Sequence, residues 1–294
     1  MARRASPRAA PRGAAALARR ALREDGFGRD RTSRAVVPDR ATAEGRVVAQ
    51  ASGVLSGIRF ARAIARAAGL RALARRADGA RVRPGLEVLV LRGNARRLLG
   101  AERTILNVLM HASGVASATA RAVRAGRGRL EVYATRKTLP GLRDLEKAAV
   151  AHGGGRPHRR DLSAAILVKS NHLALVPLES AVRRASGSAR RGERVQVEVR
   201  SAREAVRAAR AGAGALLVDN ASPARARRIV RALETARLRR GRWVELSGGI
   251  VPSRVGAYRS TGADAVSLGA LTHSAPALPF HLVLRPARLR RPPP

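Results

Sequence analysis

The sequence predicts an α/β fold, an incomplete (β/α) barrel preceded by an N-terminal α+β sandwich-like domain. From residue 130 onward, short apolar runs alternate with helical patterns, which is typical of parallel strands joined by right-handed crossovers. Polar residues and glycines follow the successive apolar runs, at the positions where barrel strands end. Before residue 101 the elements are shorter and are separated by glycine and proline turns, which indicates a separate small domain.

The N-terminal domain is expected to span residues 24–101. Its predicted elements are strands over 46–49 and 87–91 and a helix over 60–73. The preceding residues 1–23 contain seven arginines and no acidic residue, and we expect a basic, disordered N-terminus. The same composition also fits a transit peptide.

The barrel domain is expected to span residues 102–274, with a long helix over 101–125 at its start. Strands predicted over 130–134, 165–168, 195–199, 215–218, 243–246 and 265–268 alternate with helices over 142–150, 178–185, 202–211, 223–237 and 253–260. The C-terminal segment, residues 275–294, is expected to return to the N-terminal domain and to end in a disordered tail from Arg285.

Charge is the most unusual feature of the composition. The chain has 59 lysines and arginines against 20 acidic residues, a formal charge of +39, but arginine occurs in nearly every segment and aromatic residues make up only 2%. A nucleic-acid binder would gather its charge on one face and would need aromatic residues for base stacking. The pattern favours a compositional bias, so we expect no specific nucleic acid as partner.

Other classes are excluded by what the sequence lacks. Cysteine is absent, which excludes a disulfide framework and a thiol nucleophile. No apolar run approaches the roughly 18 residues of a membrane span, so we expect a cytoplasmic enzyme with no membrane partner.

The scarce residues of this arginine-rich chain point to a site. Its three lysines are Lys137, Lys147 and Lys169, and two of them follow predicted strands. An ammonium and a guanidinium do not substitute freely where an anion is tightly held. Lys137 and Lys169 are therefore expected in an active site, whereas Lys147 is expected on a solvated helix face.

Two glycine turns follow the last two strands and predict a phosphate site. They are Ser247, Gly248 and Gly249, and then Leu268, Gly269 and Ala270. Glycines allow backbone N–H groups to approach a phosphate, and barrels often bind phosphate at their late strands. Ordinary turns also select these residue types, so each turn alone is a weak signal.

A set of cations at earlier strand ends predicts an anionic ligand. Arg136, Lys137, His158, Arg159 and Lys169 would repel one another without one. Taken singly, each arginine could be a surface residue and His158 an ordinary loop residue.

Glu198 and Asp219 end neighbouring strands and are two of the few acidic residues. Carboxylates at a cationic barrel mouth suit sugar hydroxyls or Mg²⁺, held directly or through water. The alternative is that they pair with Lys137 and Lys169.

These residues lie in segments that resemble the quinolinate phosphoribosyltransferase family. The segments are Glu102-Arg103-Thr104 with Asn107, Ser113-Gly114, ATRKTLPGLRDLEKAAV at 134–150, GGG at 153–155, His158-Arg159, ILVKSNH at 166–172, VEV at 197–199, VDN at 218–220, SGGI at 247–250 and LGALTHSAPAL at 268–278. They follow the family order from about residue 24 to residue 280, and each of the scarce lysines falls on a family lysine.

The resemblance implies phosphoribosyl transfer from phosphoribosyl pyrophosphate to quinolinate with decarboxylation, in de novo NAD biosynthesis. The products would be nicotinate mononucleotide, CO₂ and pyrophosphate, with Mg²⁺ as cofactor. It also implies a homodimer with a shared active site, in which the N-terminal domain of one subunit covers the barrel mouth of the other.

The resemblance also assigns residue roles. Arg103 matches the arginine that reaches quinolinate from the partner subunit, and Thr135 lies in the matching TRK segment. The other matches are Arg136, His158 and Arg159 around the quinolinate carboxylates, Lys137 and Lys169 near the carboxylates and pyrophosphate, Glu198 and Asp219 at the ribose hydroxyls and metal, and 247–249 with 268–270 at the 5′-phosphate.

Four positions depart from the family pattern. Ala134 replaces an Asp, Pro157 an Asn, Ser170 an Asp and Arg200 an acidic residue. These four positions lie beside residues that the resemblance assigns to substrate binding. Turnover and substrate preference could therefore differ from those of the family. A same-fold transferase for another aromatic acid, such as the paralogue associated with molybdenum transport, is the alternative function. A basic nucleic-acid-binding protein is the remote one.

Overall fold

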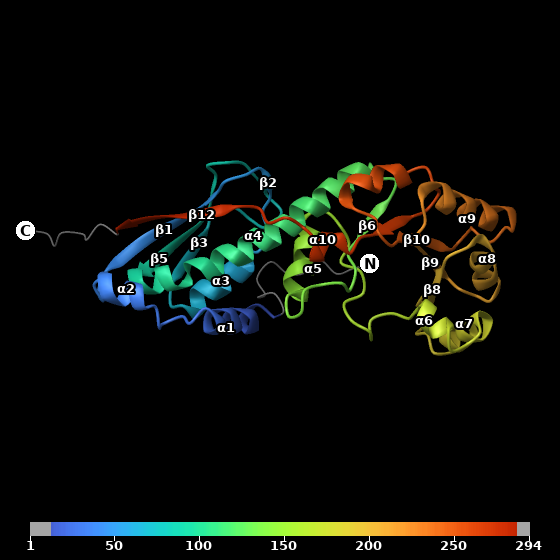
Figure 1. The fold of residues 1–294 in the computed structure, drawn as a ribbon, viewed down its shortest axis with the longest axis horizontal. Coiled ribbons are helices and arrows are strands. Elements are labelled where there is room, and N and C mark those ends of the chain that lie inside the picture. Colours follow the sequence, from blue (N-terminus) through green and yellow to red (C-terminus); the bar gives the residue numbers. More distant parts are fainter. Residues whose placement is uncertain (1–12, 287–294) are drawn as a thin grey trace, which may run out of the picture. The chain divides into compact units, whose positions relative to one another are not determined.

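A computed structural model describes residues 13–286 of the 294-residue chain. Contacts divide the chain into two compact units (Figure 1). Unit 1 contains the residues up to Ser117, Leu139–Gly153 and the C-terminal segment from Ala275. Unit 2 contains Ala118–Thr138 and Gly154–Ser274. The predicted boundary at residues 101 and 102 differs from this division, which falls within one long helix, α4 (Ala95–Gly126).

Unit 1 is built on a four-stranded antiparallel sheet. Its strand order is β12 (Phe280–Pro286), β1 (Thr42–Ala49), β5 (Glu87–Asn94) and β3 (Arg71–Ala74). Alternate residues of β1 are buried, as expected for a strand with one face on a core. The other elements are the strand pair β2 (Gly53–Val54) and β4 (Arg81–Val82), and the helices α1 (Ala14–Glu24), α2 (Arg31–Val36), α3 (Ile58–Ala67) and α5 (Arg143–His152).

Three expectations for the chain termini and the first helices were wrong. Residues 14–24 form α1 rather than a disordered segment, because Ala14, Leu17, Ala18 and Leu22 are buried along one helical face. The remaining residues of that N-terminal segment, 1–12, lie outside the described residues. Arg285 and Pro286 belong to β12, while the rest of the expected tail lies outside the described part. The helix expected over 60–73 stops at Ala67, since Gly69 adopts a left-handed conformation with φ +73°.

Two serine hydroxyls tie α4 to the rest of unit 1. The Ser117 hydroxyl accepts the backbone N–H of Val54 at 2.8 Å, and the Ser113 hydroxyl accepts that of Ser56 at 2.9 Å. The N-terminal half of α4 therefore belongs to unit 1, although the sequence placed it with the barrel.

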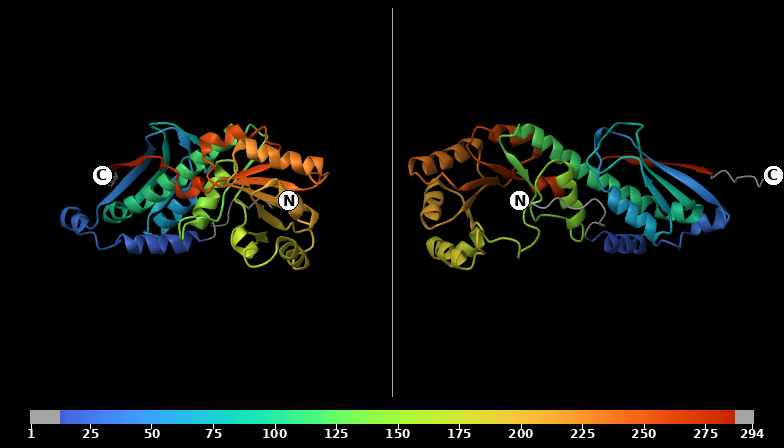
Figure 2. Two further views of the ribbon diagram at one scale, coloured as in Figure 1. Left: turned by 45° about the vertical axis from the view of Figure 1, so that its right-hand side comes forward. Right: turned by 180° about the vertical axis from the view of Figure 1, so that it is seen from behind.

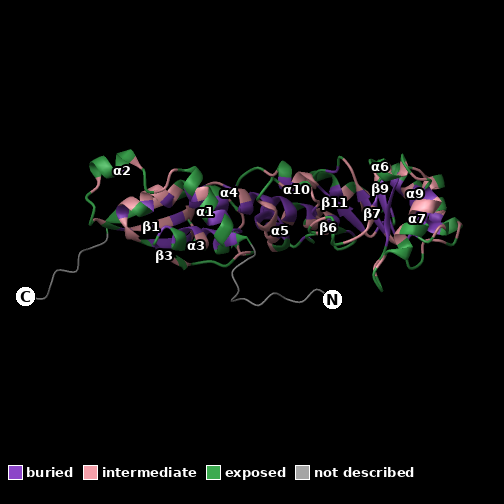
Figure 3. Cartoon of the chain, turned by 90° about the horizontal axis from the view of Figure 1, so that it is seen from below, coloured by how far each residue is buried: buried purple, intermediate pink, exposed green. Residues whose placement is uncertain are grey.

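Unit 2 is a six-stranded parallel sheet that does not close into a full barrel. Its order is β6 (Glu131–Tyr133), β11 (Ala265–Ser267), β10 (Trp243–Ser247), β9 (Ala215–Asp219), β8 (Gln196–Val199) and β7 (Leu167–Val168). Figure 3 shows these strands as largely buried. This explains why they are continuous apolar runs in the sequence.

Helices connect the strands of unit 2 as the alternating pattern predicted. They are α6 (Ser170–Leu173), α7 (Leu178–Gly187), α8 (Ala202–Arg210), α9 (Pro223–Thr235) and α10 (Ala270–His273), with a 3₁₀ helix over Pro252–Tyr258. Neighbouring helices α7, α8 and α9 pack in sequence around the sheet (Figure 2). The hydroxyls of Ser201 and Ser222 cap α8 and α9, which fixes where each helix begins just beyond a strand end. Within the described residues, no helix has both the length and the apolarity needed to cross a membrane.

Candidate active site

The strand ends of unit 2 bring most of the predicted site residues to one edge of the sheet. The strands are parallel, so their carboxyl ends lie together, and Ser247 pairs directly with Asp219 across β10 and β9. Thr135, Arg136 and Lys137 follow β6, while Gly269 follows β11. Arg103 is different: it is an exposed residue of α4 in unit 1 and is not part of this cluster within unit 2.

Glu198 lies between Lys169 and the backbone that follows it. The Lys169 Nζ is 3.7 Å from Glu198 Oε2, and the backbone N–H of Ser170 donates to Oε1 at 3.2 Å. The Glu198 side chain is 8% exposed and that of Lys169 is 46% exposed, so the ammonium faces the solvent side. The pairing foreseen as an alternative for Glu198 therefore exists, and it leaves the lysine available to a ligand.

Asp219 pairs with an arginine that the sequence analysis noted only as a departure from the family. Arg200 Nε is 3.7 Å from Asp219 Oδ2, and the same guanidinium donates to the Ser170 hydroxyl at 3.4 Å. Asn220 donates from its side chain to Asp219 at 2.9 Å. Two of the four departures thus contact each other beside a predicted ligand, and the partner of Asp219 is Arg200 rather than a lysine.

The first glycine turn has a backbone geometry that glycine accepts easily, and the second has a glycine for reasons of space. Gly248 and Gly249 have φ of +87° and +63°. A Cβ on Gly248 would lie 2.7 Å from the backbone nitrogen of Asn220. A Cβ on Gly269 would lie 3.0 Å from Cδ of Lys137, so this glycine leaves the space through which the lysine side chain extends. Both turns keep the backbone open at the strand ends, as a phosphate site requires.

A cavity of about 520 Å³ lies at the carboxyl end of β7. Its lining includes Arg136, Arg159, Lys169, Asn171 and His172. Arg136 Nε is buried without a hydrogen-bond partner, the single such side-chain atom in the described part of the chain. Burial lowers the pKa of Arg159, and the neighbouring Arg136 lowers it further. A ligand carboxylate would satisfy the free donor and offset the repulsion between the two guanidinium groups.

A buried carboxylate that the sequence analysis missed lies beneath the mouth. Glu245, on β10, is 3% exposed and its Oε1 is 3.4 Å from His158 Nε2. Gln196 donates to Oε2 at 3.1 Å. Burial raises the pKa of Glu245, but hydrogen bonds from His158, Ser267 and Gln196 outweigh it and hold the pKa below its ordinary value. An acidic residue inside an apolar strand of so basic a chain was the signal that could have identified it.

Lys147 is buried, so the expectation of a solvated helix face was wrong. It is 7% exposed, and its neighbour Glu146 is fully buried on the same helix. Glu146 is 2.8 Å from His111 Nε2 and accepts the backbone N–H of Leu139 at 3.1 Å. The α5 segment thus carries buried charges that join it to α4 and to the loop before it.

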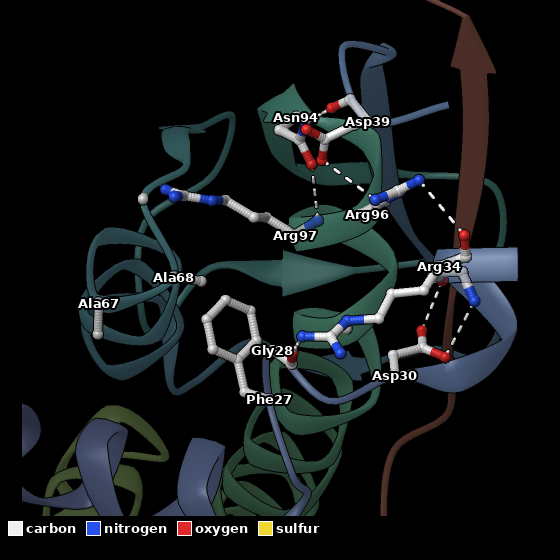
Figure 4. Close-up of a pocket in the computed structure, with 13 residues that line it drawn as sticks. Phe27, Gly28, Asp30, Arg34, Asp39, Ala67, Ala68, Asn94, Arg96 and Arg97 are labelled. Carbon is white, nitrogen blue, oxygen red and sulfur yellow. Dashed lines mark hydrogen bonds and ion pairs between the residues drawn. The ribbon is translucent and has the colours of Figure 1, made fainter. Parts of the chain in front are cut away.

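A cavity of about 950 Å³ lies in unit 1 (Figure 4). Several of the charged side chains that line it are bound by other protein groups. Arg96 donates to the carbonyl of Val37 at 2.7 Å and to Asp39 at 3.1 Å, while Arg34 donates to the carbonyl of Gly28. These contacts hold the loops around α2 against α4 and so stabilise the fold of unit 1.

The acidic residues at the sheet edge do not form a complete metal cage. Among the described residues no group of three or more His, Cys, Asp or Glu side chains could hold a metal ion. Glu198 and Asp219 offer hard oxygen donors, but each faces a cation at 3.7 Å. Mg²⁺ typically uses one or two carboxylates and takes its other ligands from water and substrate phosphates. The pair fits a magnesium ion completed by a phosphate-bearing substrate.

An open α/β barrel with an arginine-lined cavity and glycine turns at one sheet edge defines an enzyme of the phosphoribosyl-transferring class. Models of the N-terminal and C-terminal domains of quinolinate phosphoribosyl transferase match residues 30–113 and 115–283. The chain therefore belongs to the quinolinate phosphoribosyltransferase family, whose members are also named carboxylating nicotinate-nucleotide pyrophosphorylases.

Individual relatives match over nearly their whole length. A probable nicotinate-nucleotide pyrophosphorylase (carboxylating) from Methanothermobacter thermautotrophicus is 38% identical over 276 residues, 92% of this chain and 98% of that protein. The Rattus norvegicus enzyme is 37% identical over 282 residues, 93% of this chain and 92% of that protein. The crystal structure of NadC from Streptococcus pyogenes matches with a TM-score of 0.85 and 36% identity, covering 92% of this chain and 96% of that one.

Proposed function

We propose that this enzyme transfers the phosphoribosyl group of phosphoribosyl pyrophosphate to quinolinate and releases CO₂. The observation on which this depends is the pair Arg136 and Arg159, with a buried guanidinium donor of Arg136 left free at a cavity that both residues line. Two glycine turns follow strands of the same parallel sheet. A dicarboxylate satisfies those cations, and the turns suit the 5′-phosphate.

The reaction is charge-driven and needs no protein nucleophile. The pyridine nitrogen forms a bond to ribosyl C1 while the bond from C1 to pyrophosphate breaks, and its electron pair leaves with pyrophosphate. The ring nitrogen becomes cationic, so the bond to the 2-carboxylate can break with its electrons passing to the ring. CO₂ leaves, and the ring carbon takes up a proton to give nicotinate mononucleotide.

In this scheme the protein aligns two anions and stabilises the leaving charge. Arg136 and Arg159 hold quinolinate, and Lys137 and Lys169 face the carboxylates and the pyrophosphate. Glu198 is placed by the Ser170 N–H and is suited to accept a ribose hydroxyl. Asp219, held by Asn220, is suited to the same task one strand further along.

Magnesium is part of the proposal. Glu198 and Asp219 would hold the ion directly or through water, and pyrophosphate oxygens would complete its shell. When bound, Mg²⁺ would neutralise charge on the pyrophosphate. Arg200, which faces Asp219, already places one positive charge at this point.

We further propose a cytoplasmic homodimer with a shared active site. Arg103 is an exposed residue of α4 in unit 1, and it matches the family arginine that reaches quinolinate from the partner subunit, which supports this proposal. Inactive Arg103→Ala protein mixed with inactive Lys169→Ala protein should regain part of the activity after subunit exchange. No recovery in demonstrated heterodimers would contradict the shared site.

The direct test is release of CO₂ that depends on both quinolinate and phosphoribosyl pyrophosphate. Turnover of nicotinate or another aromatic acid in place of quinolinate would favour the same-fold alternative. Strongly salt-dependent DNA affinity without any turnover would favour the nucleic-acid alternative.

A further inference from the structure

The buried carboxylate of Glu245 lies under the cationic pocket and has no role in the scheme above. It is 3% exposed, and all its contacts are with protein groups: the His158 ring, the Gln196 amide and the Ser267 hydroxyl. Glu245 and Ser247 are two residues apart on β10 and share one face of the strand. The carboxylate is therefore directly below the mouth, yet too enclosed to touch a ligand.

The ring of His158 is fully engaged by the protein. Its Nδ1 accepts the backbone N–H of Arg159 at 2.7 Å, so Nδ1 carries no proton. Its Nε2 therefore carries the ring proton and is directed at Glu245, 3.4 Å away. The edge of the ring packs against Tyr133, with ring centroids 5.6 Å apart. Both ring nitrogens thus have a protein partner in this arrangement.

The hydrogen bond from Arg159 to the ring fixes an unusual turn. His158 has φ +56°, a left-handed conformation that a non-glycine residue adopts only at a cost. The next residue, Arg159, extends from this turn and donates from its guanidinium to the carbonyl of Ala165 at 3.2 Å. The direction in which Arg159 leaves the backbone therefore depends on the His158 ring staying in place.

We propose that Glu245 is a positioning residue for the quinolinate pocket and acts through His158. Glu245 accepts the Nε2–H and holds the ring in place, His158 then holds the Arg159 backbone, and Arg159 meets the substrate carboxylate. The same carboxylate partly balances the two facing arginines, since it favours the charged form of Arg159. This inference rests on the proposed function and goes beyond it, because it gives a task to a carboxylate that is enclosed beneath the site.

Imidazole NMR tests the tautomer without any reliance on activity. Long-range ¹⁵N–¹H spectra should show the His158 proton on Nε2 in the wild-type protein and in Glu245→Gln, whose amide oxygen can still accept it. In Glu245→Ala the tautomer should persist, because the Arg159 N–H still occupies Nδ1, but the Nε2–H should lose its acceptor, shift upfield and exchange faster with water. An Nδ1-protonated ring in the wild-type protein, or an Nε2–H whose shift and exchange are unchanged in Glu245→Ala, would overturn the proposal.

Steady-state kinetics of the same variants test the consequence. Glu245→Ala should raise the KM for quinolinate by about tenfold or more and leave that for phosphoribosyl pyrophosphate nearly unchanged, because only one anion is misplaced. Glu245→Gln should restore most of the loss. Glu234→Ala, which removes an exposed acidic residue of α9, is the matched control and should behave as the wild type.

A double-mutant cycle separates positioning from a general structural effect. His158→Asn removes the ring and keeps a residue that tolerates left-handed backbone. Adding Glu245→Ala to it should raise the quinolinate KM no further if the carboxylate acts through His158. Full additivity would overturn the proposal. Wild-type protein without quinolinate turnover would refute the proposed function instead, and the NMR result would still decide the geometry.

Discussion

Replacement of Gly248 by alanine should have two effects at the proposed phosphate turn, and a matched glycine elsewhere separates them. The first is backbone strain, because φ is +87° and a left-handed alanine costs about 1–2 kcal/mol. The second is a collision: the new Cβ would lie 2.6 Å from Cγ and 2.7 Å from the backbone nitrogen of Asn220. Carbon contacts are normally about 3.5–4.0 Å, so one strand end must move by about 1 Å.

The matched control is Gly241→Ala. Gly241 has a similar φ of +76°, and a Cβ there would meet nothing within 4 Å. Both variants should carry similar backbone strain, but only Gly248→Ala adds a collision, so its Tm should fall at least as far as that of Gly241→Ala and only its site should move. A shift of about 1 Å at a reacting group costs on the order of 10²-fold in kcat/KM, or about 2.7 kcal/mol. Equal kcat/KM values for the two folded variants would refute the reasoning.

Four further outcomes are expected. Lys137→Arg and Lys169→Arg should each lose most of the activity, since a planar guanidinium cannot replace a compact ammonium at an anion site; near-wild-type kcat/KM would contradict this. Lys147→Arg should lower the Tm, because the lysine is buried, and an unchanged melting curve would argue against that burial. Arg200→Ala should lower the Mg²⁺ concentration that gives half-maximal activity, because the guanidinium beside Asp219 is removed; a magnesium titration that coincides with the wild type would rule this out. The pKa of Glu245 is lowered in the folded protein, so its ionised form stabilises the fold at pH values above its ordinary pKa of 4.5. Urea unfolding between about pH 3 and pH 7 should show that the free energy of unfolding of the wild type exceeds that of Glu245→Gln near pH 7. This difference should shrink as the pH falls, and a difference that does not change with pH would contradict the reasoning.

The alternation of strands and helices in unit 2 was predictable because each parallel strand is buried on both faces. A fully buried strand is a short apolar run, and a capping serine marks the start of the helices after β8 and β9. The glycines and lysines at the strand ends were predictable for a related reason: parallel pairing gathers carboxyl ends at one edge, so local sequence positions translate into a shared site.

Burial of charged side chains was not predictable from local pattern. Lys147 lies on a helix with apolar neighbours, and only tertiary packing decides that α5 is enclosed on the face that bears it. Glu245 is surrounded by groups from three other segments, and its partners Ser267, Gln196 and His158 lie 22, 49 and 87 residues away in the sequence. Its position relative to His158 depends on sheet register, which a single sequence does not reveal. The helix α1 was missed because its arginines obscured the apolar stripe formed by Leu17, Ala18 and Leu22.

The return of the chain to the first sheet has a consequence for biosynthesis. β12 is the edge strand that pairs with β1 from Ala43 to Ala49, and it is among the last described segments to leave a ribosome. Until β12 has been synthesised, the backbone donors and acceptors along one edge of β1 remain unpaired. Such an open strand edge can associate with other chains. Closing this pair also joins segments more than two hundred residues apart, which is a slow step for topological reasons. The nascent enzyme is thus most vulnerable at its N-terminal sheet until β12 has emerged.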